Sequence, residues 1–147
     1  MTALIASLFM FLPAAAAADE GLSPNPPTTE QEQAVPQGLN PPIQIFGAVW
    51  NLSQKGSYSF NGTSASELYT EYRFKGKSSY MIKMTRVDVP LTLTVYKYNG
   101  FGQSTRLNSY RMYGAGASVS LTGWNVNDEL YLSFIPDSYS SFGGYIG

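Results

Sequence analysis

The stretch Leu91-Thr92-Leu93-Thr94-Val95-Tyr96 decides the fold that we predict for this chain. Apolar and polar side chains alternate along it, and Asn99-Gly100 follows three residues later. Successive side chains of an extended strand point to opposite faces, so leucine and valine share one face while threonine and tyrosine share the other. Asn-Gly readily adopts the positive φ angles of a tight hairpin turn. The stretch therefore predicts a half-buried β-strand that ends in a hairpin.

The same two-residue period recurs on both sides of this stretch. Val119 and Leu121 alternate with hydroxyl residues, and Leu130, Leu132 and Phe134 share one parity of a later segment. No window of helical length shows a 3.6-residue period. Strands are predicted at about 43–50, 55–60, 67–75, 79–87, 90–98, 105–113, 117–122, 129–136 and 142–146. Eight or nine short strands favour an all-β, antiparallel two-sheet β-sandwich that is jelly-roll-like.

Turn and break residues refine this prediction. Asn61-Gly62 predicts a second hairpin turn, and Asn127-Asp128 predicts a reversal before the strand at 129–136. Apolar residues change parity near Thr85, which predicts a bulge or a strand end there. Because proline cannot donate to a sheet ladder, Pro90 should begin its strand, and Pro136 should end one or lie at an edge.

The N-terminal 18 residues are typical of an export signal. The run Leu4–Ala18 carries no charge and closes in five alanines directly before Asp19-Glu20. Small residues after a short apolar run are typical of the cleavage site of a secretory signal peptide. As a helix this run would span only ~22 Å, whereas a bilayer core needs ~30 Å. We therefore predict a cleaved signal peptide at 1–18, no stable membrane anchor, and a secreted, extracellular or cell-surface location.

Residues 19–42 differ in composition from the rest of the chain. They hold four acidic residues and no basic one, together with Pro24, Pro26, Pro27, Pro36, Pro41 and Pro42. Such a segment cannot bury enough apolar surface to offset its ordering entropy, so we predict a disordered acidic spacer. The domain predicted at 43–147 holds all nine Lys and Arg against six acids, a net charge of 9 − 6 = +3. This charge is too small to predict nucleic-acid binding.

Composition also bears on chemistry. The chain has no His and no Cys, so it lacks the usual general base, activated thiol and transition-metal ligands. Glu67 and Glu71 would lie ~13 Å apart on a strand, too far for glycoside hydrolysis. We therefore predict a protein that is not an enzyme and has no cofactor or metal. The oxygen-rich run Asn125–Glu129 leaves calcium as an alternative, but a turn explains these residue types equally well. The absence of Cys in an exported domain favours a bacterial source.

Tyrosines supply the candidate binding surface. Tyr96 and Tyr98 fall on the threonine face of the strand at 90–98, and Arg106, Tyr110 and Arg111 follow on the next strand. Exposed rings of this kind stack on sugars or serve as a protein-binding patch. The alternative is that half-exposed tyrosines simply suit a pleated surface and cross-strand pairing. We predict these five residues as the ligand-binding site.

Several segments also resemble a known family. They are Tyr58-Ser59-Phe60, Tyr72-Arg73-Phe74, Tyr80-Met81-Ile82, Leu91–Tyr96, Gly123, Glu129–Phe134 and Gly144-Tyr145-Ile146. Their succession resembles the bacterial pre-peptidase C-terminal domain and related small secreted β-sandwiches. The resemblance implies a β-sandwich without catalysis of its own and an accessory or surface-interaction role.

These observations lead to one main functional hypothesis. The chain is expected to be an exported, non-catalytic β-sandwich that binds an extracellular glycan, a cell-wall polymer or another protein through its surface. The alternative is a structural or assembly subunit of a surface or extracellular complex, in which an exposed edge strand pairs between chains.

Overall fold

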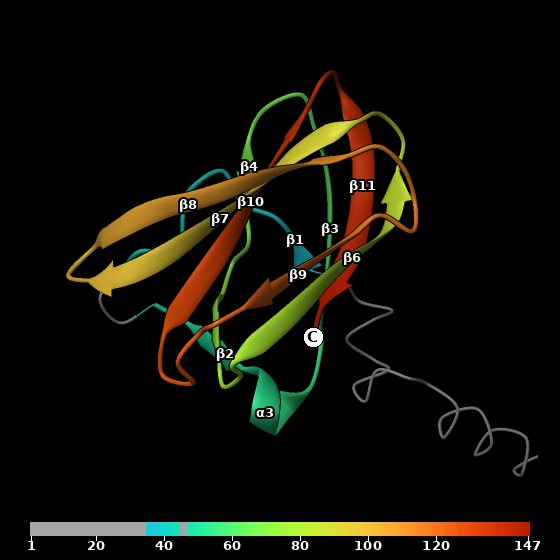
Figure 1. Cartoon of the computed structure of the whole chain (residues 1–147). Coiled ribbons are helices and arrows are strands. Elements are labelled where there is room, and N and C mark those ends of the chain that lie inside the picture. Colours follow the sequence, from blue (N-terminus) through green and yellow to red (C-terminus); the bar gives the residue numbers. More distant parts are fainter. Residues whose placement is uncertain (1–34, 45–46) are drawn as a thin grey trace, which may run out of the picture.

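The computed structural model describes residues 35–44 and 47–147, which form an all-β sandwich of two sheets (Figure 1). Sheet A contains, in spatial order, β1 (Val35–Pro36), β3 (Tyr58–Ser64), β11 (Ser140–Ile146), β6 (Ser79–Val87) and β9 (Ser118–Thr122). Sheet B contains β2 (Val49–Asn51), β5 (Arg73–Lys75), β10 (Glu129–Pro136), β7 (Leu91–Gly100) and β8 (Gln103–Met112), with β4 (Leu68–Tyr69) also paired to β10. The predicted fold class is confirmed.

The strand order is that of a jelly roll. The antiparallel pairs β3–β11, β5–β10, β6–β9 and β7–β8 would together make one long hairpin. Folding this hairpin over itself brings β11 beside β6 and β10 beside β7, again antiparallel. The eight strands thus divide into two four-stranded layers, as in a jelly roll. The shorter strands β1, β2 and β4 add to these layers.

The core lies between the sheets and is built from the predicted parities. Leu91, Leu93 and Val95 of β7 are at most 1% exposed, and the apolar residues of β10 and β9 face the same interior. Several aromatic rings pack together in this core. Three of them are Phe60, Phe134 and Phe142. The ring centroid of Phe134 lies 4.7 Å from that of Phe60 and 4.9 Å from that of Phe142. The alternation of side chains along the strands therefore places the buried apolar residues of both sheets in one core.

Two local predictions, the bulge near Thr85 and the strand end at Pro136, are confirmed, and two others are close but shifted. The register between β6 and β11 shifts so that Gly143 pairs with Arg86 and Gly144 with Met84, which leaves Thr85 as the extra residue of a bulge. Pro136 is the last residue of β10. Pro90 does not begin its strand but lies one residue before it, because β7 begins at Leu91. The predicted hairpin between β7 and β8 is present, but its turn is formed by Phe101 and Gly102, because Asn99 and Gly100 still belong to β7.

Other predictions fail because tertiary contacts override local signals. Asn61-Gly62 makes no turn but lies inside β3, where Asn61 pairs with Gly143 and Gly62 with Phe142. Glycine is needed there for space, since a Cβ on Gly62 would lie 2.6 Å from a carbon of the Phe142 ring. The strand predicted at 55–60 accordingly begins at Tyr58 and continues to Ser64.

The predicted N-terminal strands are also shorter than expected. Of the strand predicted at 43–50, β2 contains only Val49 and Trp50, and the chain then forms a one-turn helix, α3 (Leu52–Lys55). The Asn51 side chain caps this helix by accepting a hydrogen bond from the Ser53 amide at 3.1 Å. The strand predicted at 67–75 is split into β4 and β5. This split and the unpredicted strand β1 raise the count from nine predicted strands to eleven among the described residues. Two outer pairings, β1 with β3 and β2 with β5, are parallel.

The described part of the predicted spacer, residues 35–42, contacts the sandwich. Residues 35 and 36 form β1, the Gln37 amide donates to the Asn61 carbonyl oxygen at 3.1 Å, and Gly38 pairs with Tyr69. Backbone hydrogen bonds to the sandwich thus order the last residues of the segment that composition alone indicated to be disordered. The predicted signal peptide at 1–18 and the spacer up to residue 34 lie outside the described residues. Among the described residues, no helix is long and apolar enough to cross a membrane.

Candidate functional site

The predicted site residues divide between two faces of sheet B. Tyr96, Tyr98, Arg106 and Arg111 lie on its outer side, because the register pairs Tyr96 with Arg106 and Thr92 with Arg111. Tyr110 has the opposite parity and packs against the core. The prediction that all five residues form one surface is therefore wrong. A register shift in β8 between the partners of Thr94 and Tyr96 separates them further.

Four tyrosines lie on the outer side of sheet B, and we call them the tyrosine face: Tyr69, Tyr96, Tyr98 and Tyr131. The rings of Tyr96 and Tyr131 are stacked, with centroids 4.8 Å apart and planes 5° apart. Tyr69 packs against both, with centroids 6.4 and 6.3 Å away. The Tyr131 hydroxyl shares a hydrogen bond of 2.7 Å with Ser104. These contacts match the cross-strand packing that was the alternative to an exposed ligand surface.

Tyr98 belongs to a second group of contacts on the same face. The Arg73 guanidinium lies 4.0 Å from the centre of the Tyr98 ring and is only 3% exposed. Arg73 also forms an ion pair with Glu129 and donates to the carbonyl oxygens of Pro42, at 2.7 Å, and Gln44, at 2.8 Å. All of these partners come from the chain itself, so Arg73 fastens an N-terminal segment to the sheet.

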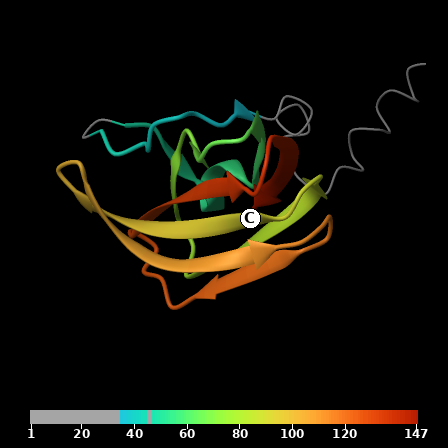
Figure 2. The same ribbon diagram turned by 90° about the horizontal axis from the view of Figure 1, so that it is seen from above.

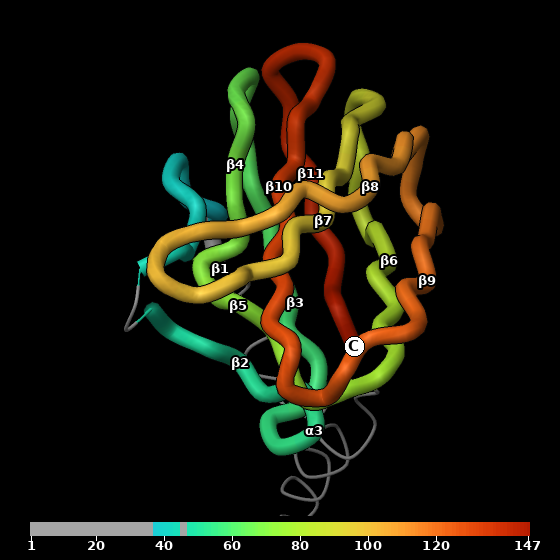
Figure 3. Tube along the Cα trace, turned by 60° about the vertical axis from the view of Figure 1, so that its left-hand side comes forward, coloured from blue at the N-terminus to red at the C-terminus, as the bar shows by residue number. Residues whose placement is uncertain are grey.

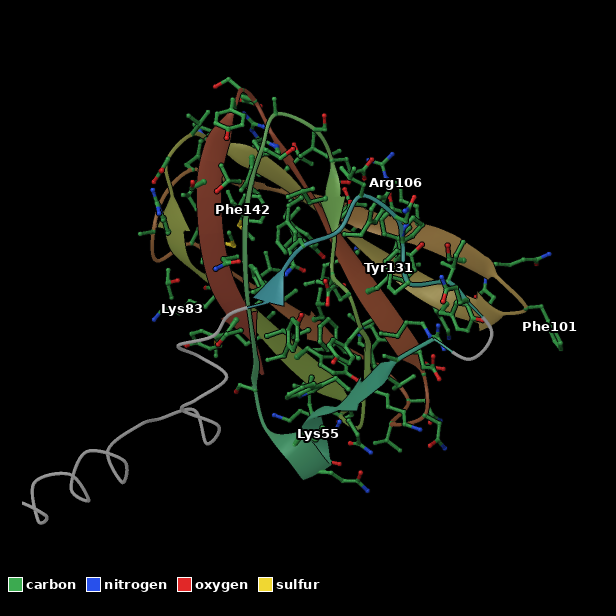
Figure 4. The ribbon with its side chains drawn as sticks, turned by 180° about the vertical axis from the view of Figure 1, so that it is seen from behind. Lys55, Lys83, Phe101, Arg106, Tyr131 and Phe142 are labelled. Atoms are coloured by element: carbon green, nitrogen blue, oxygen red, sulfur yellow. The ribbon has the colours of Figure 1, made fainter. Side chains whose placement is uncertain are left out.

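Residues 37–44, the covering segment, lie across the tyrosine face. Gly38 and Tyr69 exchange two backbone hydrogen bonds, of 3.0 and 2.7 Å, and the segment continues to the Arg73 contacts. In Figure 4 it passes in front of β10 near Tyr131 and Arg106, and Figure 2 shows it extending towards the tip of the β7–β8 hairpin. Tyr131 is only 2% exposed, and Tyr96 is half-buried. The expected open row of tyrosines is therefore largely closed.

Burial changes the acidity of this face. Burial, followed by the nearby charge of Glu67, raises the pKa of Tyr69 from 10.0 to about 12. Burial also raises the pKa of Tyr131. Both phenols therefore hold their protons more tightly in the folded protein than a solvent-exposed tyrosine does.

The predicted arginines are engaged within the chain. The Arg106 guanidinium donates to the Ser109 hydroxyl at 2.8 Å, and Arg111 binds the carboxylate of Asp137 through two nitrogens. The hydrogen bonds from Arg111 lower the pKa of Asp137. Both arginines are exposed, so their ligand-binding role stays a prediction.

The more open site lies on the other side of β8, where the edges of the two sheets face each other. A hollow of about 360 Å³, which we call the cleft, opens between β8 and β9. Figure 3 shows these two strands at the same side of the molecule, joined by residues 113–117. The cleft is lined by Val95, Lys97, Leu107, Asn108, Tyr110, Ser120, Leu121, Thr122, Gly123, Trp124 and Asp128. Its volume falls at the small end of the range of about 300–1,000 Å³ typical of ligand pockets.

Two aromatic rings give the cleft its apolar surface. Trp124 is half-buried, and its ring packs edge-on against Tyr80 with centroids 6.1 Å apart. The Trp124 amide donates to the Ser78 carbonyl oxygen at 3.1 Å, and Gly123 precedes it with a φ of +82°, which favours glycine. Among the described residues the Trp124 indole N–H has no acceptor. Tyr110 brings a second ring, whose hydroxyl accepts from the Asn108 amide nitrogen at 3.3 Å.

Charged and polar groups border these rings. The Lys97 ammonium lies 3.2 Å from the Asp128 carboxylate. A hydrogen bond from the Asn125 amide, followed by one from Lys97, lowers the pKa of Asp128. One positive and one negative side chain, which can donate and accept hydrogen bonds, thus lie beside the apolar surface of the rings. Such a set suits an uncharged polar ligand, which presents hydroxyl groups and a C–H face, better than a strongly charged one.

The oxygen-rich turn is a turn in the structure. Asp128 accepts from the Asn125 amide at 3.1 Å, and Asn125 accepts from the Asn127 amide at 2.9 Å. Within residues 35–44 and 47–147, no three His, Cys, Asp or Glu side chains group as metal ligands.

Sequence reasoning included only one residue of this cleft, Tyr110, among the predicted site residues. Trp124 was not among them and is half-buried at the edge of the cleft. The sequence feature that could have pointed to this cleft is a tryptophan directly after a glycine, in a stretch without charges. What the sequence could not supply was the pairing of β9 with β6, which places Trp124 opposite β8.

Comparison with known proteins assigns no family. No family model matches the chain, and no curated protein matches it. Among solved structures, the chain is similar to one described as "Crystal structure of PirA", at 15% sequence identity and a TM-score of 0.43, over 61% of this chain and 90% of that one.

Proposed function

We propose that this protein is an exported, non-catalytic β-sandwich that binds an extracellular glycan, such as a cell-wall polymer, in the cleft between β8 and β9. The observation that carries the proposal is the placement of Trp124 and Tyr110 beside the Lys97–Asp128 pair in one hollow. Export rests on the N-terminal sequence alone, and the absence of a catalytic role rests on composition.

Glycan binding follows from the chemistry of these groups. The face of a sugar ring presents C–H groups that pack on an aromatic ring, while its hydroxyls need donors and acceptors close by. The cleft offers the Trp124 and Tyr110 rings for the first contact. It offers the Asn108 amide, the Lys97 ammonium and the Asp128 carboxylate for the second. The small volume, about 360 Å³, fits one or two sugar rings rather than a protein segment.

The test is retention of the full chain on insoluble peptidoglycan and on a glycan array, compared with its variants. Trp124→Ala should weaken binding to the retained glycan at least tenfold, about 1.4 kcal/mol, because it removes the larger ring. Tyr113→Ala is the matched control, since Tyr113 is an aromatic residue that is 72% exposed and lies outside the cleft. The control should bind like the wild type.

A second, milder variant tests binding without the risk that the protein fails to fold. Asn108 is exposed, so Asn108→Ala should fold normally and still weaken binding by about 1 kcal/mol, the net value of one hydrogen bond. Equal retention of the wild type, Trp124→Ala and Asn108→Ala on every glycan tested would refute the proposed function, as would no retention of the wild type.

A further inference from the structure

The backbone edge of β9, a strand whose residues Ser120, Leu121 and Thr122 also line the cleft, carries an inference that goes beyond the proposed function. β9 is the last strand of sheet A and pairs with β6 along one side only. Within the described part of the chain, no strand pairs with its other side. An unpaired edge is a template for another strand.

The backbone groups on this open side can be identified from the neighbouring ladder. Met81 of β6 exchanges two hydrogen bonds with Gly147, of 2.8 and 2.9 Å, so its N–H and C=O point away from β9. Ser120 is the partner of Met81, which makes theirs a non-hydrogen-bonded pair. The backbone groups of Ser120 therefore point outward, to the open edge. By the same alternation, those of Ser118 and Thr122 do so as well.

The ladder on the other side of β6 agrees with this assignment. The Met84 amide donates to the Ala117 carbonyl oxygen at 2.8 Å, and the Ser78 carbonyl oxygen accepts from the Trp124 amide at 3.1 Å. Before the bulge at Thr85, the backbone N–H and C=O groups of the even-numbered residues of β6 thus point towards β9, and those of the odd-numbered residues point towards β11.

β9 also lacks the devices that usually protect an edge. Residues 112–127 contain no charged residue and no proline. The edge strand of sheet B differs, because β8 carries Arg106 and Arg111 and has two register shifts against β7. Charges and bulges are the usual means of blocking strand addition. Of these two edges, only β9 is left uncharged and regular.

We propose that β9 pairs antiparallel with β9 of a second copy of this chain, with a two-fold axis at Ser120. This register sets Ser120 against Ser120, Ser118 against Thr122 and Val119 against Leu121. Hydroxyl residues then meet hydroxyl residues on the outer side, and buried aliphatic residues meet aliphatic residues on the inner side. The two A sheets become one continuous sheet joined by roughly six backbone hydrogen bonds.

A second copy fits this edge better than an unrelated strand. A two-fold interface uses the same patch twice, so it forms only where a patch is complementary to itself. A strand without charges meets that condition, because no like charges face each other across the axis. A five-residue strand buries little area, so the pairing is expected to depend on concentration.

Light scattering after size exclusion of the full chain, over a dilution series, tests the pairing. The wild type should shift from the mass of one chain towards twice that mass as the concentration rises. Ser120→Lys should remain a monomer throughout, because it sets two ammonium groups against each other at the axis. Thr85→Lys adds the same charge to β6, away from this edge, and should associate like the wild type.

A second variant acts on the backbone instead of the charge. Ser120→Pro removes an N–H that points to the open edge, so the ladder to β6 should survive and the association should be lost. Circular dichroism of both Ser120 variants reports whether the sandwich is intact. A wild type that stays monomeric at every concentration would overturn the proposal. So would folded Ser120→Lys and Ser120→Pro proteins that both associate like the wild type.

Discussion

The tyrosine face and the cleft lie on opposite sides of sheet B, and both are rich in aromatic side chains. On the tyrosine face the rings contact one another, and the covering segment, fastened by Arg73, lies over them. In the cleft, Trp124 and Tyr110 border a hollow of about 360 Å³. Both regions thus present aromatic rings, four on the tyrosine face and two in the cleft, but the partners of the rings differ. We therefore assign the proposed binding to the cleft, where the chain leaves the aromatic rings uncovered.

The comparison predicts that removing Arg73 has the largest effect on stability. Arg73→Met leaves Glu129 without its ion-pair partner and two carbonyl oxygens without a donor, so unfolding should become easier by about 3–5 kcal/mol. Urea unfolding measures this change. Arg86→Met is the control, because Arg86 pairs with Asp88 on an exposed surface, with 61% of its side chain accessible. Equal changes for the two variants would show that Arg73 does not hold the face closed.

The next largest effect is expected for Tyr96→Ala. This variant removes a half-buried ring that is stacked on Tyr131, and it should cost about 2 kcal/mol of stability. Glycan retention should be unchanged, since Tyr96 lies on the side of the sheet away from the cleft. Tyr139→Ala, at a residue that is 74% exposed, is the control for stability. A loss of glycan retention in folded Tyr96→Ala protein would move the binding site to the tyrosine face.

A smaller effect is expected from alkaline pH. The pKa of Tyr69 is raised from 10.0 to about 12, so the folded protein holds this proton more tightly than the unfolded chain does. The stability that this group contributes is fully present below pH 10 and is lost as the pH rises towards 12. Tyr69→Phe should flatten this part of the curve of unfolding midpoint against pH, whereas Tyr139→Phe should not. Curves of equal slope for the wild type and Tyr69→Phe would contradict the burial of the phenol.

Strand parity predicted the inner faces of the sandwich well. The residues Leu91, Leu93 and Val95 of β7 and their counterparts in β10 are buried as expected, because side-chain alternation is a local property of extended backbone. The bulge at Thr85 was likewise readable from a change of parity. Features that depend on residues distant in the sequence could not be predicted in this way. Gly62 looks like a turn residue, yet the Phe142 ring keeps it inside a strand.

The candidate site could likewise be predicted only where it depends on local sequence. Parity placed Tyr96 and Tyr98 on the outer side of sheet B correctly, but the sequence could not show that residues 37–44 return over them. Proline content indicated disorder for that segment, and hydrogen bonds from Arg73 and to Gly38 override it. Trp124 and Tyr110 are 14 positions apart in the sequence and lie in the same cleft only because β8 and β9 belong to different sheets.

One measurement tests the contrast between the two regions most directly. The array glycan that the wild type binds best is titrated into isotope-labelled protein, and the amide and indole resonances are followed by NMR. Binding in the cleft predicts that the largest shifts occur at the Trp124 indole N–H and the Asn108 side-chain amide, with little change at Tyr96 and Tyr131. Shifts centred on Tyr96 and Tyr131, with the Trp124 indole unmoved, would contradict it.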